Sequence, residues 1–224
     1  MNMSSGALRT PPVVKNLLII NGLVFLAQML LPNGIGNWMI AKFALFFWES
    51  QYFHVYQFLT HIFLHGDISH LFLNMFSLWM FGRILEYDLG SKRFLIFYLV
   101  CGVGAGLFYS LVNWIEIGHL VNIAAENPEA ISKAISLINT PSIGASGAVY
   151  GILFAFGMIH PNSTIMLLIP PIPMKAKYFV LIFMVLEILA GLMVNDNIAH
   201  FAHVGGMLWA FLLLKIWKVR KSNY

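Results

Sequence analysis

Ser146, His203, His70 and Asn74 are the residues of this sequence whose types and spacing suit catalysis of acyl transfer. A serine hydroxyl is a weak nucleophile that becomes effective beside a base, and an imidazole is the commonest such base. His70 and Asn74 are four residues apart, so they lie on one face of a helix. Each histidine alone is more often a hydrogen-bonded packing residue. The elements that carry these residues therefore decide the interpretation.

The composition places these elements in a membrane. Hydrophobic residues make up 59% of the 224 residues and charged residues only 10%, against ~45–50% and ~25% in a soluble domain. The mean hydropathy is +0.79. Too few charges remain to cover a globule, so a soluble enzyme, a disordered protein and a nucleic-acid binder are disfavoured. The single cysteine, Cys101, cannot form an internal disulfide.

Six apolar runs are long enough to cross a hydrocarbon core of ~30 Å. They are Val13–Leu31, Ser69–Tyr87, Phe94–Trp114, Gly144–Ile159, Tyr178–Val194 and Ile198–Trp217. We expect an all-α membrane protein with a bundle of six transmembrane helices. Residues 1–224 are predicted to form a single membrane domain with no separate soluble domain. The longest polar stretch, Glu116–Ser142, is predicted to be a loop that contains a short amphipathic helix.

The distribution of positive charge predicts the orientation of these spans. Eleven of the 13 Lys and Arg residues lie at one set of span ends, and only Lys42 and Lys133 lie at the other. By the positive-inside rule, both termini are cytoplasmic. The apolar and aromatic segment Ile35–His65 then lies on the outer side, in the interface or dipping into the membrane against protein. The alternative, a seventh span, would invert the charge bias of everything downstream.

This orientation puts the chemistry-bearing residues at one depth. The second, fourth and sixth spans enter from the outer side, and His70, Ser146 and His203 each follow a few residues later. From Ser146 to His160 the helix is about 21 Å long. With His160 taken as the inner boundary of a ~30 Å core, Ser146 lies about 10 Å below the outer surface. The backbone of Pro141–Ala145 is then irregular at membrane depth, which requires a water-filled cavity or surrounding protein.

These motifs together resemble the rhomboid family of intramembrane serine proteases. The resemblance rests on GASG, the His70–Asn74 pair and AHVGG on alternate spans, and it covers roughly Tyr52 to the end of the sixth span. It implies an endopeptidase that cleaves transmembrane substrate proteins within the lipid bilayer, with no cofactor and no metal. The depth of Ser146 puts the cleavage near the outer end of the substrate helix. We expect a multi-pass protein of a bacterial inner membrane.

The resemblance assigns a catalytic dyad to Ser146 and His203. The histidine is the one that Gly205 and Gly206 follow closely, and these glycines allow the fourth and sixth spans to approach each other. Tyr150 matches the family's aromatic ring that packs against the histidine. No acid is expected as a third member, because Glu187 is predicted to lie too deep.

The same resemblance assigns the oxyanion donors. They are the side chains of His70 and Asn74 and the backbone N–H of Ser146, which begins a helix. Gly144 and Gly147 are expected to support the site by close packing, without a catalytic role.

The sequence departs from the family pattern in the first outer segment. Many bacterial members carry Trp-Arg where this chain has Tyr56-Gln57, so the polar contacts of that arginine must be absent. The family's Arg-and-Glu feature at the inner end of the second span is represented by Arg83 and Glu86.

Two alternatives to a protease remain open from the sequence. One is a membrane transporter with a histidine-lined metal or proton site, built from His61, His65, His70, His200 and His203. It would need acidic partners at the same depth, and the chain lacks inverted repeats. The other is an inactive rhomboid-like binding protein, against which the presence of both Ser146 and His203 counts.

Overall fold

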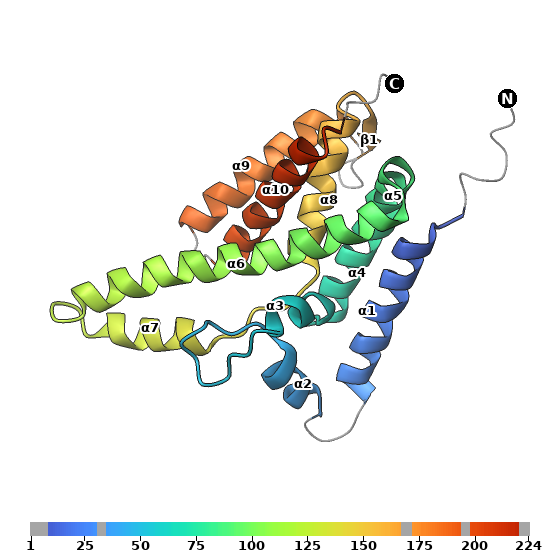
Figure 1. The fold of residues 1–224 in the computed structure, drawn as a ribbon. Helices are drawn as coiled ribbons and strands as arrows, with labels where there is room; N and C mark the ends of the chain where they lie inside the picture. Colours follow the sequence, from blue (N-terminus) through green and yellow to red (C-terminus); the bar gives the residue numbers. More distant parts are fainter. Residues whose placement is uncertain (1–8, 31–34, 167–171, 194–197, 220–224) are drawn as a thin grey trace, which may run out of the picture.

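The structure, a computed structural model, describes residues 9–30, 35–166, 172–193 and 198–219, and this part of the chain is largely helical (Figure 1). Helical segments occupy all six predicted spans. They are α1 (Pro12–Leu30), the continuous segment α4–η2–α5, α6 (Ser91–Ile123), α8 (Ser146–Ile159), α9 (Ala176–Met193) and α10 (Ile198–Ile216). The predicted span ends at Leu31 and Val194 lie outside the described residues. The prediction of an all-α membrane bundle is confirmed.

Four of these segments are long and apolar enough to cross a membrane by length and hydropathy alone: α1, Ile68–Leu89, α6 and α9. The second of them contains α4 (Ile68–Ser77), a π-helical turn η2 (Leu78–Gly82) and α5 (Arg83–Leu89). Asp67 begins it by accepting the backbone N–H of His70 at 2.8 Å, as expected for an N-cap. The other two helices at predicted spans, α8 and α10, are apolar as well.

The start of α1 is held by Glu86 of α5. Its carboxylate oxygens accept the backbone N–H groups of Val13 at 3.0 Å and Val14 at 2.8 Å. Ser91 also donates its hydroxyl to this carboxylate, at 2.6 Å. A negative charge at a helix N-terminus satisfies unpaired donors and interacts favourably with the helix dipole. The Arg-and-Glu feature therefore contributes a contact between α1 and the second span.

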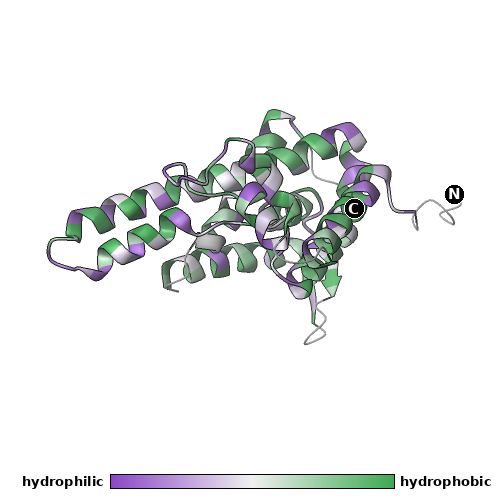
Figure 2. Cartoon of the chain, turned by 90° about the horizontal axis from the view of Figure 1, so that it is seen from below, coloured by the Kyte–Doolittle hydropathy of each residue, from purple (hydrophilic) through white to green (hydrophobic). Residues whose placement is uncertain are grey.

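The third span is longer than predicted. The helix continues from the predicted end at Trp114 to Ile123, so the polar stretch Glu116–Ser142 is not a loop throughout. The expected amphipathic helix is present as α7 (Glu129–Asn139). It folds back along the end of α6, and Lys133 forms an ion pair with Glu116 at 2.7 Å. This α6–α7 hairpin extends from the bundle and carries hydrophilic and hydrophobic residues side by side (Figures 1 and 2).

The outer segment forms no seventh span in its described part. It contains the short helices α2 (Ile35–Phe43) and α3 (Gln57–Thr60) and the 3₁₀ turn η1 (His61–Phe63), joined by turns. Three exposed aromatic side chains follow its surface: Trp48, Tyr52 and Tyr56. Their exposure agrees with the predicted place in the interface, where amphipathic rings are favoured.

Gln57 organises this segment from its centre. The fully buried side chain accepts the backbone N–H groups of Phe46 and His54 at Oε1, at 3.3 and 3.2 Å. Its Nε2 donates to the carbonyls of Lys42 at 3.2 Å and Tyr52 at 2.9 Å. At this position, where the polar contacts of an arginine were expected to be absent, Gln57 supplies four hydrogen bonds to the backbone.

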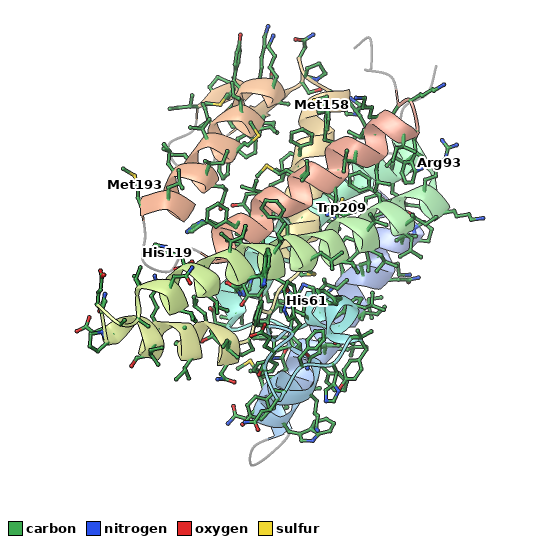
Figure 3. The ribbon with its side chains drawn as sticks, turned by 60° about the vertical axis from the view of Figure 1, so that its left-hand side comes forward. His61, Arg93, His119, Met158, Met193 and Trp209 are labelled. Atoms are coloured by element: carbon green, nitrogen blue, oxygen red, sulfur yellow. The ribbon has the colours of Figure 1, made fainter. Side chains whose placement is uncertain are left out.

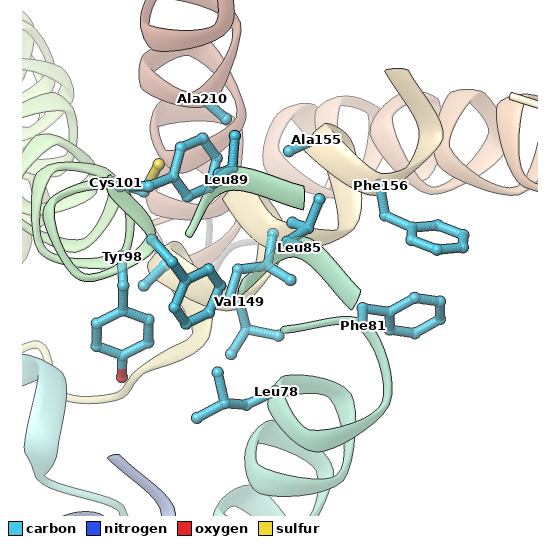
Figure 4. Packing of buried hydrophobic residues seen from close by; sticks show 14 of the residues in the cluster. Leu78, Phe81, Leu85, Leu89, Tyr98, Cys101, Val149, Ala155, Phe156 and Ala210 are labelled. Carbon is cyan, nitrogen blue, oxygen red and sulfur yellow. The ribbon is translucent and has the colours of Figure 1, made fainter. Parts of the chain in front are cut away.

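Small residues let α8 pack directly on its neighbours in the centre of the bundle (Figure 4). A Cβ added to Gly206 of α10 would lie 1.9 Å from the carbonyl oxygen of Gly147, and one added to Gly147 would lie 2.3 Å from Cβ of Ala105 on α6. Cys101 of α6 is buried against Gly151. Such backbone contact is typical of helix pairs in membranes. The expected close approach of the fourth and sixth spans is therefore present.

We expect Gly206→Ala to destabilise the protein by about 1–3 kcal/mol, the usual cost of overpacking. Because the added methyl meets a backbone oxygen, α8 and α10 must separate. Gly118→Ala is the matched control, since nothing lies within 4 Å of a Cβ at this exposed position of α6. Thermal melts in detergent compare the two, and equal melting temperatures would contradict the packing argument.

The fourth and fifth predicted spans are joined through a short antiparallel hairpin that the sequence did not predict. Its strands are β1 (Thr164–Met166) and β2 (Pro173–Lys175). Beside it, His160 at the end of α8 contacts Asp88 of α5 at 2.6 Å. This contact fixes the end of α8 against the second span.

Candidate active site

Ser146 is the first residue of α8, and the segment in front of it is irregular as predicted. Ser142 exchanges two backbone hydrogen bonds with Leu45, at 2.9 and 2.8 Å, and the N–H of Gly144 donates to the carbonyl of His61 at 3.0 Å. The outer segment therefore satisfies backbone groups that would otherwise be costly at membrane depth. The backbone that precedes Ser146 is therefore supported by hydrogen bonds to the outer segment.

His61 and His65 belong to this support. The Nδ1–H of His61 donates to the carbonyl of Gln57 at 2.8 Å, and the ring lies beside Gly106 of α6 (Figure 3). Burial lowers the pKa of His61 to about 4, and burial likewise lowers the pKa of His65 to about 4. Both rings are thus neutral at pH 7. Their role in the described structure is packing of the outer segment.

Ser146 and His203 lie within hydrogen-bond distance of each other. The hydroxyl oxygen of Ser146 is 2.9 Å from Nε2 of His203, which projects from α10. The ring of Tyr150, one turn along α8, stacks on the imidazole with a centroid distance of 4.1 Å and an angle of 10°. The structure therefore brings together the three residues that the sequence motifs named for nucleophile, base and aromatic support.

His70 lies beside the segment that leads to Ser146. Gly144 has φ +130°, and a Cβ there would lie 2.8 Å from Nε2 of His70 and 3.6 Å from Oγ of Ser146. Only glycine fits, because the backbone angle and the imidazole both exclude a side chain. His70 and the serine hydroxyl therefore both lie next to Gly144.

Asn74 is buried one turn further along α4. Its Nδ2 donates to the carbonyl of His70 at 2.9 Å. With Tyr150, it lines a cavity of about 530 Å³ between α4, η2, α8, β1 and α9. The remaining wall is mainly apolar, including Leu73, Phe76, Met80, Leu153 and Phe183. Of the two predicted oxyanion side chains, His70 thus lies beside Gly144 and Ser146, and Asn74 lines the cavity.

Glu187 does not lie too deep, and that prediction is wrong. Its Oε2 is 2.9 Å from Nδ1 of His203 and 2.7 Å from Nδ1 of His200, and its Oε1 accepts the hydroxyl of Tyr150. Glu187 is six residues before the end of α9 at Met193. His203 is five residues after the start of α10. Counting from the shared ends of two antiparallel helices would have placed both side chains at one depth.

A family model described as "Rhomboid domain" matches residues 52–219. "RHOMBOID-like protein 12, mitochondrial" of Arabidopsis thaliana is 31% identical over 169 residues, which are 74% of this chain and 47% of that protein. "Rhomboid protein 1, mitochondrial" of Saccharomyces cerevisiae is 34% identical over 111 residues, 50% of this chain and 27% of that protein. "Rhomboid protease GlpG" of Yersinia pestis is 28% identical over 179 residues, 78% of this chain and 52% of that protein. The chain thus spans about half of the length of these relatives or less.

Proposed function

Because the chain belongs to the rhomboid family, which includes intramembrane serine proteases, we propose that it is an intramembrane serine endopeptidase with Ser146 as nucleophile and His203 as general base. The observation that carries the proposal is the 2.9 Å separation of Oγ and Nε2 inside a bundle of apolar helices. The chain is a multi-pass integral membrane protein, and its substrates are transmembrane proteins.

The base acts through Nε2 of His203. It takes the proton of the Ser146 hydroxyl as Oγ attacks the scissile carbonyl, and it returns a proton to the leaving amine as the peptide bond breaks. Water then hydrolyses the acyl-enzyme by the same route. Stacking on Tyr150 holds the imidazole in the plane that aims Nε2 at the hydroxyl.

Three donors are proposed for the oxyanion. The N–H of Ser146 is the first of α8 and has no acceptor within the helix. The side chains of His70 and Asn74 come from α4, whose His70 lies next to Gly144. Donors that are already oriented stabilise the developing negative charge without reorganisation, which is usually a large share of catalysis.

Asn74→Ala should lower kcat by roughly 10–1000-fold with little change in KM, because the lost donor acts mainly in the transition state. His70→Ala should behave likewise. Asn21→Ala is the matched control. Its side chain is buried on α1 and donates to the carbonyl four residues earlier, as that of Asn74 does. Kinetics on a single-span test substrate separates the two parameters. A variant that lost only affinity would identify its residue as a substrate contact instead of an oxyanion donor.

The substrate is proposed to approach through the cavity that Asn74 and Tyr150 line. Its apolar wall suits the side chains of a transmembrane helix. With His160 taken as the inner boundary of the membrane core, Ser146 lies about 10 Å below the outer surface. Cleavage near the outer end of the substrate helix follows, with both termini of the enzyme in the cytoplasm. Weak helix formers near the cleaved bond should favour it, since the carbonyl must be unwound from its helix.

The comparisons do not support one particular membrane. The relatives come from a plant, a yeast and a bacterium, and two of them are named mitochondrial. The expectation of a bacterial inner membrane therefore gains no support over the membrane of an organelle.

A metal site is the alternative with a specific structural feature. The ligand atoms of Glu187, His200 and His203 all lie within 4.8 Å of one another. However, the carboxylate oxygen is 2.7 and 2.9 Å from the two imidazole nitrogens. Ligands of a tetrahedral zinc would be about 3.3 Å apart, from bond lengths of ~2.0–2.1 Å. The separations are those of hydrogen bonds.

A fluorophosphonate probe tests the proposal on the purified protein in detergent. Covalent labelling that persists in the presence of a chelator is the expected result, because a serine nucleophile needs no metal. Labelling that depends on added metal, or transport without labelling, would favour the metal-site alternative. Absence of labelling in a folded protein would favour the inactive binding protein.

A further inference from the structure

We propose that Glu187 positions the catalytic base, so that Ser146, His203 and Glu187 act as a triad. This inference rests on the proposed function, and it deepens that function by adding a residue outside the motifs that named the dyad. Glu187 touches neither Ser146 nor a reacting atom. It is a positioning residue that acts through His203.

The first argument is the protonation of the two rings that face Glu187. A carboxylate only accepts hydrogen bonds, so the Nδ1 atoms of His200 and His203 both carry protons directed at Oε2. A neutral His203 with its proton on Nδ1 has its lone pair on Nε2, 2.9 Å from the hydroxyl of Ser146. That is the tautomer a general base requires. Glu187 therefore selects the productive form of His203.

The second argument is geometric. The face of the His203 ring rests on Tyr150, and its Nδ1 edge is held by Glu187. Tyr150 donates its own hydroxyl to the second oxygen of the same carboxylate. One carboxylate thus ties α8, α9 and α10 together around the imidazole. Rotation of the ring about its Cβ–Cγ bond would break the Nδ1 contact and the stacking at once.

The third argument is the burial of the charge. Glu187 is 9% exposed within an apolar helix, where an unpaired carboxylate would be costly. Two imidazole N–H groups and one phenol O–H supply the hydrogen bonds that such a group needs. The arrangement is complete without any further partner, so the carboxylate can stay ionised beside the base.

His200 shares the oxygen that His203 uses. Its ring stands at 89° to that of His203, with centroids 6.3 Å apart. It donates to Oε2, whereas the hydrogen bond to Ser146 is made by His203. His200 thus helps to hold the carboxylate in place, which gives this histidine a structural role beside the base.

The test compares Glu187→Gln with Glu187→Asp. Glutamine keeps the shape but presents an amide N–H₂, so three donors meet a group with only one acceptor oxygen, and the inactive tautomer of His203 becomes competitive. Aspartate is shorter but still accepts only. We expect Gln to slow fluorophosphonate labelling and kcat by about 100-fold with KM unchanged, less than the ~10⁴-fold known for amide replacement in a buried triad. Asp should recover part of that loss.

The order of activity of Glu187→Gln and Glu187→Asp distinguishes a positioning role of Glu187 from a packing role. A purely structural Glu187 would tolerate Gln better than Asp, and its losses would follow the melting temperature in detergent. That ranking, or wild-type labelling of a folded Glu187→Gln, would overturn the inference. Glu116→Gln is the control, since that carboxylate pairs with Lys133 on the α6–α7 hairpin. If wild-type protein itself is not labelled at Ser146, the proposed function fails first, and the triad with it.

Discussion

Ser146→Ala is expected to abolish both fluorophosphonate labelling and cleavage of a single-span substrate, a fall of roughly 10⁶-fold in kcat. The hydroxyl oxygen is the atom that bonds to the probe and to the acyl group, so no neighbouring residue can replace it. The loss removes one hydrogen bond to His203 and no packing atoms beyond a single oxygen. The melting temperature should therefore stay within a few degrees of the wild type.

Ser110→Ala controls for this change. Ser110 is a fully buried serine of α6 whose hydroxyl has no hydrogen-bond partner among the described residues. The Ser110→Ala variant should be labelled by the probe and should cleave the substrate at the wild-type rate. Cleavage by a purified Ser146→Ala preparation at the rate of the wild type would remove Ser146 from the mechanism.

The second large effect distinguishes the two histidines of α10. His203→Ala should eliminate essentially all activity, about 10⁴-fold or more, because only Nε2 of this residue reaches the serine hydroxyl. His200→Ala should keep a measurable fraction, since it removes one of three donors to Glu187 and leaves the contact of His203 in place.

Thermal melts in detergent establish that both variants are folded before their activities are compared. His203→Ala also loses the ring that stacks on Tyr150, so a modest drop in its melting temperature is expected. An inert His200→Ala together with an active, folded His203→Ala would mean that the base has been misassigned, and that the register of α10 is wrong as well.

The fold was largely predictable because long apolar runs in the sequence mark the helices of the bundle. Each predicted span coincides with a helix whose described ends differ by a few residues, except for α6. There the sequence becomes more polar after Trp114, but the helix continues because α7 covers its apolar side chains, among them Ile117 and Leu120. Where a helix is covered by one neighbour outside the bundle, its sequence is not continuously apolar, so hydropathy does not reveal it.

The site was predictable where a residue's depth follows from its distance to a helix start. Ser146 and His203 were matched in this way, and they lie in contact. Glu187 was missed because its depth was judged within α9 alone, although the next helix runs antiparallel to it. The hydrogen bonds of Gln57 were not predicted, for another reason. Its importance comes from four backbone partners that the turns of the outer segment bring together, and no periodicity reports such a centre.

The contacts between Leu45 and Ser142 join positions about 100 residues apart, and this separation sets an order of events during biosynthesis. At ~5–20 residues per second, the outer segment leaves the ribosome roughly 5–20 s before the chain that carries Ser146. Ser146 is thus synthesised after the segment with which its preceding residues pair, and the helix with His203 follows. A nascent chain that stops before α10 carries Ser146 without His203, so the two side chains that contact each other are both present only after α10 has been made.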